Sequence, residues 1–136
     1  MTLACLPLLR AEVVASEIVP LGDRDPGAVC MVIAELVASL ARRRPQVTAL
    51  GISIGGQVAD HVIVSQAPFL HWTDVPLRDM VENATGVPTV VENDLIALTE
   101  AEHWFGAGRG LDRFAVVTVG AGVGYGLVVR GQPCHG

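Results

Sequence analysis

The stretch that decides the fold runs from Val91 to Val129 and reads VENDLIALTEAEHWFGAGRGLDRFAVVTVGAGVGYGLVV. An apolar strand pattern passes into a helix pattern through the pair Asn93-Asp94. A second apolar strand then leads into a glycine-dense turn, Gly120 to Gly126. Strands that alternate with helices are typical of α/β proteins, whose open sheets bind ligands at the carboxyl ends of their strands. The stretch therefore predicts an α/β fold with a small-molecule site beside Asn93-Asp94.

Asn93 and Asp94 carry side chains that suit the binding of a polyol. A carboxylate accepts hydrogen bonds and a carboxamide both donates and accepts them, so the pair could hold two neighbouring hydroxyl groups. Asp94 could also take a proton from a hydroxyl that attacks a phosphoryl group. Asn and Asp are equally the preferred N-caps of helices, so the pair could simply begin the next helix. The residues alone leave both interpretations open, and one side chain can serve both.

Two glycine-rich segments could bring the backbone close to a ligand. In the segment Gly120-Ala121-Gly122-Val123-Gly124-Tyr125-Gly126, successive N–H groups could approach an anion. The segment leads into a strand and has neither the G-x-G-x-x-G spacing of dinucleotide-binding folds nor the Gly-Lys-Ser/Thr of a P-loop. A tight hairpin is the simpler explanation. Gly55-Gly56 follows another strand and could likewise admit a ligand or turn the chain.

Capping and periodicity extend the α/β pattern upstream. Asp25 can cap a helix that has Pro26 at its first position, and four apolar residues follow at helical spacing. We predict strands at 3–9, 12–19, 47–54, 62–64, 87–91, 113–119 and 126–129. We predict helices from Pro26 to about Arg42–Arg44, from Pro76 to Gly86 with Leu77, Met80, Val81 and Ala84 inward, and from Asp94 to Phe105.

Composition narrows the class of protein. The chain has 136 residues, of which 51% are hydrophobic, and its net charge is −5. A chain of this length suits one domain. The basic run Arg42 to Arg44 is too short to indicate a nucleic-acid-binding surface. The three cysteines are far apart, and no uncharged run is long enough to cross a membrane. We therefore expect a cytoplasmic α/β domain with no membrane span and no metal site.

A series of motifs resembles the ROK family (repressors, open reading frames and sugar kinases). The series comprises Gly51-Ile52-Ser53-Ile54-Gly55-Gly56-Gln57-Val58, Ala67-Pro68-Phe69-Leu70-His71-Trp72, Val75-Pro76-Leu77, Val91-Glu92-Asn93-Asp94, Ala101-Glu102-His103-Trp104-Phe105-Gly106-Ala107-Gly108 and Val119-Gly120-Ala121-Gly122-Val123-Gly124. The resemblance implies the actin-like ATPase, ribonuclease-H-like fold, with a mixed sheet and flanking helices. It implies that Asn93, Asp94, Gly55 and Gly56 bind the sugar, with Asp94 as catalytic base in a kinase. The turn Gly120-Ala121-Gly122 corresponds to a phosphate-contacting turn.

The chain departs from the kinases of this family at several points. It lacks the Asp-x-Gly-Gly-Thr phosphate loop with which these kinases begin. It also lacks the Glu-x-Gly-His sugar motif and the cysteine-rich zinc loop that usually follow the last glycine turn. Ala121 stands where kinases often have Thr, and Phe69 stands where many members have Asn. The winged-helix segment of the family's repressors is also absent. We therefore expect residues 1–136 to form a single partial ROK domain, without the first phosphate loop and the C-terminal lobe.

Three functional hypotheses follow from the resemblance. The first is the sugar-recognition part of a ROK-type transcriptional regulator, which would bind a small-molecule sugar and associate as a dimer. It would reach nucleic acid only through a DNA-binding segment that this chain lacks. The second is a fragment of an ATP-dependent hexose kinase that uses ATP and Mg²⁺, with Asp94 as general base. The third is a non-catalytic remnant or interaction module. We expect this chain alone to show no kinase activity.

Overall fold

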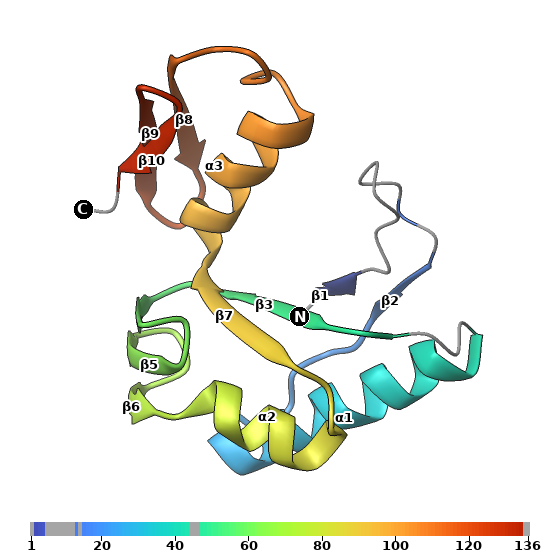
Figure 1. Cartoon of the computed structure of the whole chain (residues 1–136). Coiled ribbons are helices and arrows are strands. Elements are labelled where there is room, and N and C mark those ends of the chain that lie inside the picture. Colours follow the sequence, from blue (N-terminus) through green and yellow to red (C-terminus); the bar gives the residue numbers. More distant parts are fainter. Residues whose placement is uncertain (1, 5–12, 14, 44–46, 135–136) are drawn as a thin grey trace.

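The computed structural model describes residues 2–4, 13, 15–43 and 47–134. Its elements in chain order are β1 (Thr2–Ala4), β2 (Ser16–Ile18), α1 (Pro26–Arg43), β3 (Leu50–Ile54), β4 (Gln57–Ala59), β5 (Ile63–Ala67), β6 (Trp72–Val75), α2 (Leu77–Thr85), β7 (Thr89–Asn93), α3 (Asp94–Phe105), β8 (Arg113–Val119), β9 (Val123–Val129) and β10 (Gln132–Cys134). Figure 1 shows that β1 to β7 with α1 and α2 form one body, while α3 and β8 to β10 form another. Strand β7 runs directly into α3 and joins the two.

A parallel strand pair brings the motifs Gly55-Gly56 and Asn93-Asp94 together. Strands β3 and β7 pair in parallel, from Leu50 opposite Thr89 to Ile54 opposite Asn93. Parallel strands end at the same edge, so the glycines that follow β3 lie beside the start of α3. The strands β4, β5 and β6 form an antiparallel sheet, as do β8, β9 and β10, and β1 pairs with β2. The mixed α/β architecture agrees with the sequence prediction.

Helix α1 supplies much of the core. The Asp25 carboxylate accepts hydrogen bonds from the backbone N–H groups of Gly27 (2.9 Å) and Ala28 (3.2 Å), as predicted for an N-cap. The stripe Val29, Ile33, Leu36 and Leu40 is buried against the first body. Each such side chain contributes about 1.5–3 kcal/mol on burial. The core is completed by Val64, Ala67, Trp72, Val75, Leu77, Val81 and Val91.

Several predicted elements are confirmed and several boundaries differ. Helix α3 has the predicted bounds. Helix α2 ends at Thr85 and is capped by Gly86, the predicted stop, whose φ of 69° is left-handed. Ala84 is exposed, so its predicted inward position is wrong, while Met80 is partly buried. Strand β3 begins at Leu50 rather than residue 47, and β9 begins at Val123, which shortens the glycine turn. Most of the predicted strand 3–9 falls outside the described residues.

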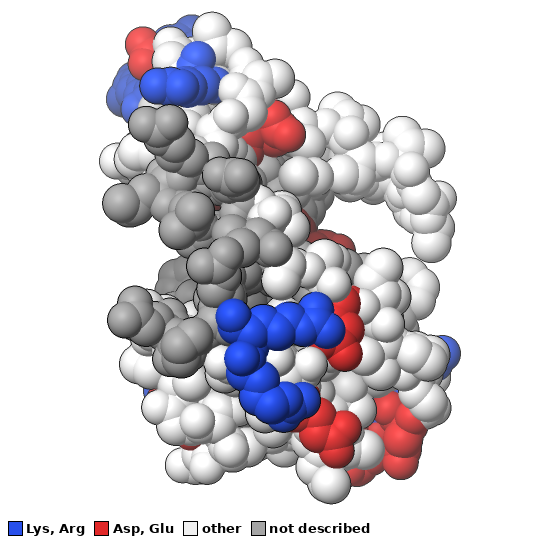
Figure 2. All heavy atoms as spheres, turned by 90° about the vertical axis from the view of Figure 1, so that its right-hand side faces the viewer, with Lys and Arg blue, Asp and Glu red and all other residues white. Residues whose placement is uncertain are grey.

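The surface carries charges of both signs. On the face seen in Figure 2, basic side chains of the described residues lie beside acidic ones. Arg43 exemplifies this, since its Nη2 lies 3.9 Å from Glu17 Oε2. Within the part of the chain that the structure describes, no helix is long and apolar enough to cross a membrane.

Candidate functional site

The junction between β7 and α3 is built around the Asn93 side chain. Asn93 Oδ1 accepts hydrogen bonds from the backbone N–H groups of Leu95 (2.9 Å) and Ile96 (3.1 Å). Asn93 is therefore the N-cap of α3, with an extended backbone (φ −59°, ψ 138°). The capping interpretation of this residue is confirmed. Asn93 Oδ1 accepts two hydrogen bonds here, which use both lone pairs of the amide oxygen.

The same side chain ties the junction to the glycine loop after β3. Asn93 Nδ2 donates a hydrogen bond of 2.6 Å to the carbonyl oxygen of Gly56. The amide retains one further N–H, which is free of this bond and can face a ligand. The motifs Gly55-Gly56 and Asn93-Asp94, which lie far apart in the sequence, are thus one hydrogen-bonded unit in the structure.

Asp94 lies at the first position of α3 and is exposed. Its Oδ1 accepts a hydrogen bond of 2.8 Å from the Leu95 N–H. Its Oδ2 faces Gly55, at 3.5 Å from the position that a Cβ on Gly55 would occupy. An acidic residue in the first turn of a helix interacts favourably with the helix dipole. One carboxylate oxygen is therefore held by the helix while the other faces the glycine loop.

The two glycines of the loop have different physical roles. A Cβ on Gly56 would overlap with the carbonyl oxygen of Gln66 in β5, so only glycine fits there. A Cβ on Gly55 would meet only Asp94 Oδ2, at an ordinary van der Waals distance. Gly56 thus allows the loop to pack closely against β5. Gly55 leaves open space beside Asp94.

The second glycine segment also divides into two parts. Gly124 and Gly126 lie in β9 directly under α3, where a Cβ would press on Leu95 and overlap with Thr99 respectively. Gly120 and Gly122 flank the turn and have open space around them, and the Gly120 N–H donates to the Gly122 carbonyl (2.9 Å). The turn Gly120-Ala121-Gly122 is therefore exposed backbone. The start of α3, which carries Asp94, packs on β9, the strand that follows this glycine turn.

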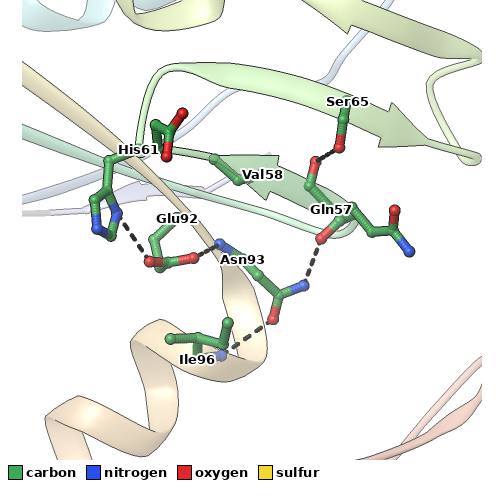
Figure 3. A pocket seen from close by; sticks show the side chains of 9 residues that line it. Gln57, Val58, His61, Ser65, Glu92, Asn93 and Ile96 are labelled. Carbon is green, nitrogen blue, oxygen red and sulfur yellow. Dashed lines mark hydrogen bonds and ion pairs between the residues drawn. The ribbon is translucent and has the colours of Figure 1, made fainter. Parts of the chain in front are cut away.

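A cavity of about 690 Å³ lies beside the junction, between the β4–β5 hairpin and the start of α3. Figure 3 shows polar side chains around it, among them Gln57, His61, Ser65 and Glu92. Sequence reasoning singled out neither His61 nor Glu92 as a site residue. His61 Nδ1 lies 3.0 Å from Glu92 Oε2, a contact between residues that no local pattern links.

Comparison with known proteins places this geometry in context. The model of the ROK family matches residues 8–136. A glucokinase from Halalkalibacterium halodurans is 30% identical over 133 residues, which cover 92% of this chain and 40% of that protein. The chain therefore spans less than half the length of this relative.

Two solved structures resemble the fold. The ROK family glucokinase from Streptomyces griseus, in complex with glucose and AMPPNP, superposes with a TM-score of 0.88 at 31% identity. The match covers 99% of this chain and 43% of that one. A ROK family transcriptional regulator, a homologue of the E. coli MLC protein, superposes with a TM-score of 0.82 at 25% identity. This match covers 92% of this chain and 33% of the regulator's chain.

The fold is that of the actin-like ATPase class in which the sugar kinases are found, as the sequence predicted. Within that class the chain belongs to the ROK family. The family resemblance carried by the motif series is thereby confirmed, and its relatives include both glucokinases and transcriptional regulators.

Proposed function

We propose that this chain provides sugar recognition in a ROK-type transcriptional regulator, with Asp94, Asn93, Gly55 and Gly56 as the sugar-binding residues. The observation that carries the proposal is the hydrogen-bonded unit of the β7–α3 junction and the glycine loop. It holds Asp94 Oδ2 toward the open space at Gly55. The relative from Streptomyces griseus, which binds glucose, supports a sugar as the ligand.

The chemistry of the site fits a polyol. Asp94 Oδ2 accepts a hydrogen bond from one sugar hydroxyl, and the remaining Nδ2–H of Asn93 donates to a neighbouring one. The absence of a side chain at Gly55 lets the ring approach the backbone. A charged acceptor strengthens the first of these hydrogen bonds, so Asp94 is the main determinant of affinity.

The turn Gly120-Ala121-Gly122 favours a regulator over a kinase. It is exposed and open, but Ala121 contributes a methyl group in place of a hydroxyl. A phosphate there would have backbone N–H groups as its donors from this turn. A sugar sensor needs the hydroxyl-binding side of the site and does not need phosphoryl transfer, and the similarity to a ROK transcriptional regulator agrees with this.

The alternative is an ATP-dependent hexose kinase, which the similarity to glucokinases supports. In that case Asp94 would accept the proton of the sugar hydroxyl as the hydroxyl oxygen attacks the γ-phosphorus of ATP, and ADP would leave. Mg²⁺ would neutralise the phosphate charge. Because the chain spans 40% of the glucokinase from Halalkalibacterium halodurans, we propose that residues 1–136 are a partial domain, whose full site requires further chain.

The test is a sugar titration of the wild-type chain followed by NMR, using glucose, mannose, galactose and other common hexoses. We expect weak binding of one or more sugars, and a loss of about tenfold or more in affinity for Asp94→Ala, since hydrogen bonds to charged groups are the strong ones. The matched control is Glu100→Ala, which removes another exposed carboxylate of α3. Equal affinity in the wild type and Asp94→Ala would contradict the proposal.

A coupled ATP-consumption assay tests the kinase alternative directly on this chain. We expect no sugar-dependent turnover by this chain. Turnover that disappears in Asp94→Asn would establish the kinase alternative in place of the sensor. An absence of both binding and turnover would favour the third hypothesis, a remnant or interaction module.

A further inference from the structure

The turn between β4 and β5 docks on strand β7. Both residues of its tip, Asp60 (φ 53°) and His61 (φ 58°), have left-handed backbone conformations. Such conformations are uncommon outside glycine and cost free energy unless the surroundings fix them. Here the surroundings do so, because the His61 carbonyl accepts a hydrogen bond of 3.1 Å from the Val91 N–H. The turn thereby lies against the strand that leads into the candidate site.

Glu92 connects this turn to the site. Its Oε2 lies 3.0 Å from His61 Nδ1, and its Oε1 accepts a hydrogen bond of 2.7 Å from the Asn93 N–H. The Asn93 side chain continues the chain of contacts, since it bonds to Gly56 and caps α3. The β4–β5 hairpin is therefore fastened to the β7–α3 junction at both ends, by Gly56 at its base and by His61 at its tip (Figure 3).

We propose that His61 and Glu92 are positioning residues, which act through Asn93 to set the orientation of the Asn93-Asp94 junction toward the sugar. This inference rests on the proposed sugar-binding function. Glu92 restrains the backbone of the last residue of β7, and His61 restrains the Glu92 carboxylate. Neither side chain needs to touch the sugar for this role.

Exposure argues against a role in stability alone. The His61 side chain is 63% exposed, whereas that of Glu92 is 20% exposed. A pair this open to solvent contributes little to the free energy of unfolding. The contact between His61 and Glu92 is nevertheless made by a turn with two left-handed residues. It lies next to Asn93, the residue that caps α3. Its effect should therefore be local to the junction.

The experiment compares His61→Asn and Glu92→Gln in the full chain. Asn tolerates left-handed backbone better than most residues, so His61→Asn keeps the turn while removing the imidazole. Gln retains a carbonyl oxygen that can accept from the Asn93 N–H while losing the charge. The matched control is His71→Asn, because His71 is also exposed and left-handed (φ 60°) but lies at a different turn.

Three quantities are measured: sugar affinity by NMR titration, amide hydrogen exchange along α3, and stability by urea unfolding. In both variants we expect a loss of affinity of about two- to fivefold, the range that an exposed pair allows. We expect faster exchange at the capped amides of Leu95 and Ile96, with little change in unfolding. The double variant should resemble each single variant, because the two residues act through one contact. The control should match the wild type.

Other outcomes overturn the proposal. Unchanged exchange at Leu95 and Ile96 does so whether or not the chain binds a sugar, which separates this failure from a failure of the proposed function. Faster exchange throughout the chain would show a general stabilising role instead. Unchanged affinity in both variants, in a chain whose sugar binding depends on Asp94, would show that the contact does not reach the site.

Discussion

At the scale of single residues, Gly55 and Gly56 are neighbours with opposite requirements. We predict that Gly56→Ala lowers the free energy of unfolding by about 1–3 kcal/mol, because the added Cβ overlaps with the backbone of β5, which cannot move aside cheaply. Gly55→Ala should change it by less than about 0.5 kcal/mol, since the space there is open. Urea unfolding of the two variants measures the difference. Equal destabilisation would show that the loop relaxes around the new side chain.

The same pair of variants separates folding from binding. Gly55→Ala places a methyl group between the sugar and Asp94 Oδ2, so we predict a loss of sugar affinity in a stable chain. NMR titration with the sugar that the wild type binds gives the affinity. Unaltered affinity would mean that the ligand does not approach the backbone at Gly55.

The two cysteines in the described residues differ in environment. Cys30 is buried in α1, and this burial raises the pKa of its thiol above the usual 9.0. Cys134 is exposed. The reactive thiolate of Cys30 therefore forms only at higher pH, and we predict that N-ethylmaleimide modifies Cys134 much faster near neutral pH. Mass spectrometry of the Cys30 and Cys134 peptides measures both rates. Comparable rates would indicate that α1 opens readily.

At the scale of elements, the contact between α3 and β9 depends on glycine in the strand. Thr99 is buried, and its Oγ1 donates a hydrogen bond of 2.7 Å to the Leu95 carbonyl. A Cβ on Gly126 would overlap with this hydroxyl. We predict that Gly126→Ala costs about 1–3 kcal/mol in thermal or urea unfolding. Gly122→Ala, in the open turn of the same hairpin, is the control and should cost less than about 0.5 kcal/mol.

Elements with strong local signals were predictable from the sequence. Helix α1 follows an Asp-Pro start and carries an apolar stripe, and α3 lies between Asn93 and Gly106. Strands β4, β6 and β10 were missed. β4 and β10 have three residues each, β10 contains Pro133, and β6 buries its two ends rather than alternate positions. Pairing with neighbouring strands decides these segments, and a short segment carries no periodicity of its own.

The candidate site was predictable in position and not in its connections. The order strand, Asn93-Asp94, helix placed the pair at a strand end next to a helix start, where the structure has it. The hydrogen bond from Asn93 to Gly56 spans 37 positions, and the contact of His61 with Glu92 spans 31. Such contacts follow from the packing of the β4–β5 hairpin on β7. Residue types alone do not encode them.

At the scale of the whole molecule, one face of the β8–β9–β10 sheet is apolar and is exposed in the part of the chain that the structure describes. Val117, Val119, Val123, Tyr125 and Leu127 are all exposed, and the strand register places them on the same face, opposite the side that packs on α3. Apolar surface gathered on one side of a sheet drives association. We therefore expect the chain on its own to self-associate through this face, in line with the predicted dimer.

Substitution of two side chains on this face tests the expectation. In Val119→Glu/Tyr125→Glu, like charges would meet across the contact, and acidic side chains also favour solubility. We predict that sedimentation velocity shows association of the wild type that weakens by about tenfold or more in the double variant, since each buried, unpaired charge is costly. The control is Met31→Glu, another exposed apolar position, which lies in α1 and is remote in sequence from the sheet. Association that persists in the double variant and falls in the control would place the contact on α1 instead. A monomeric wild type would contradict the expectation, because the apolar face would then be stable in contact with water.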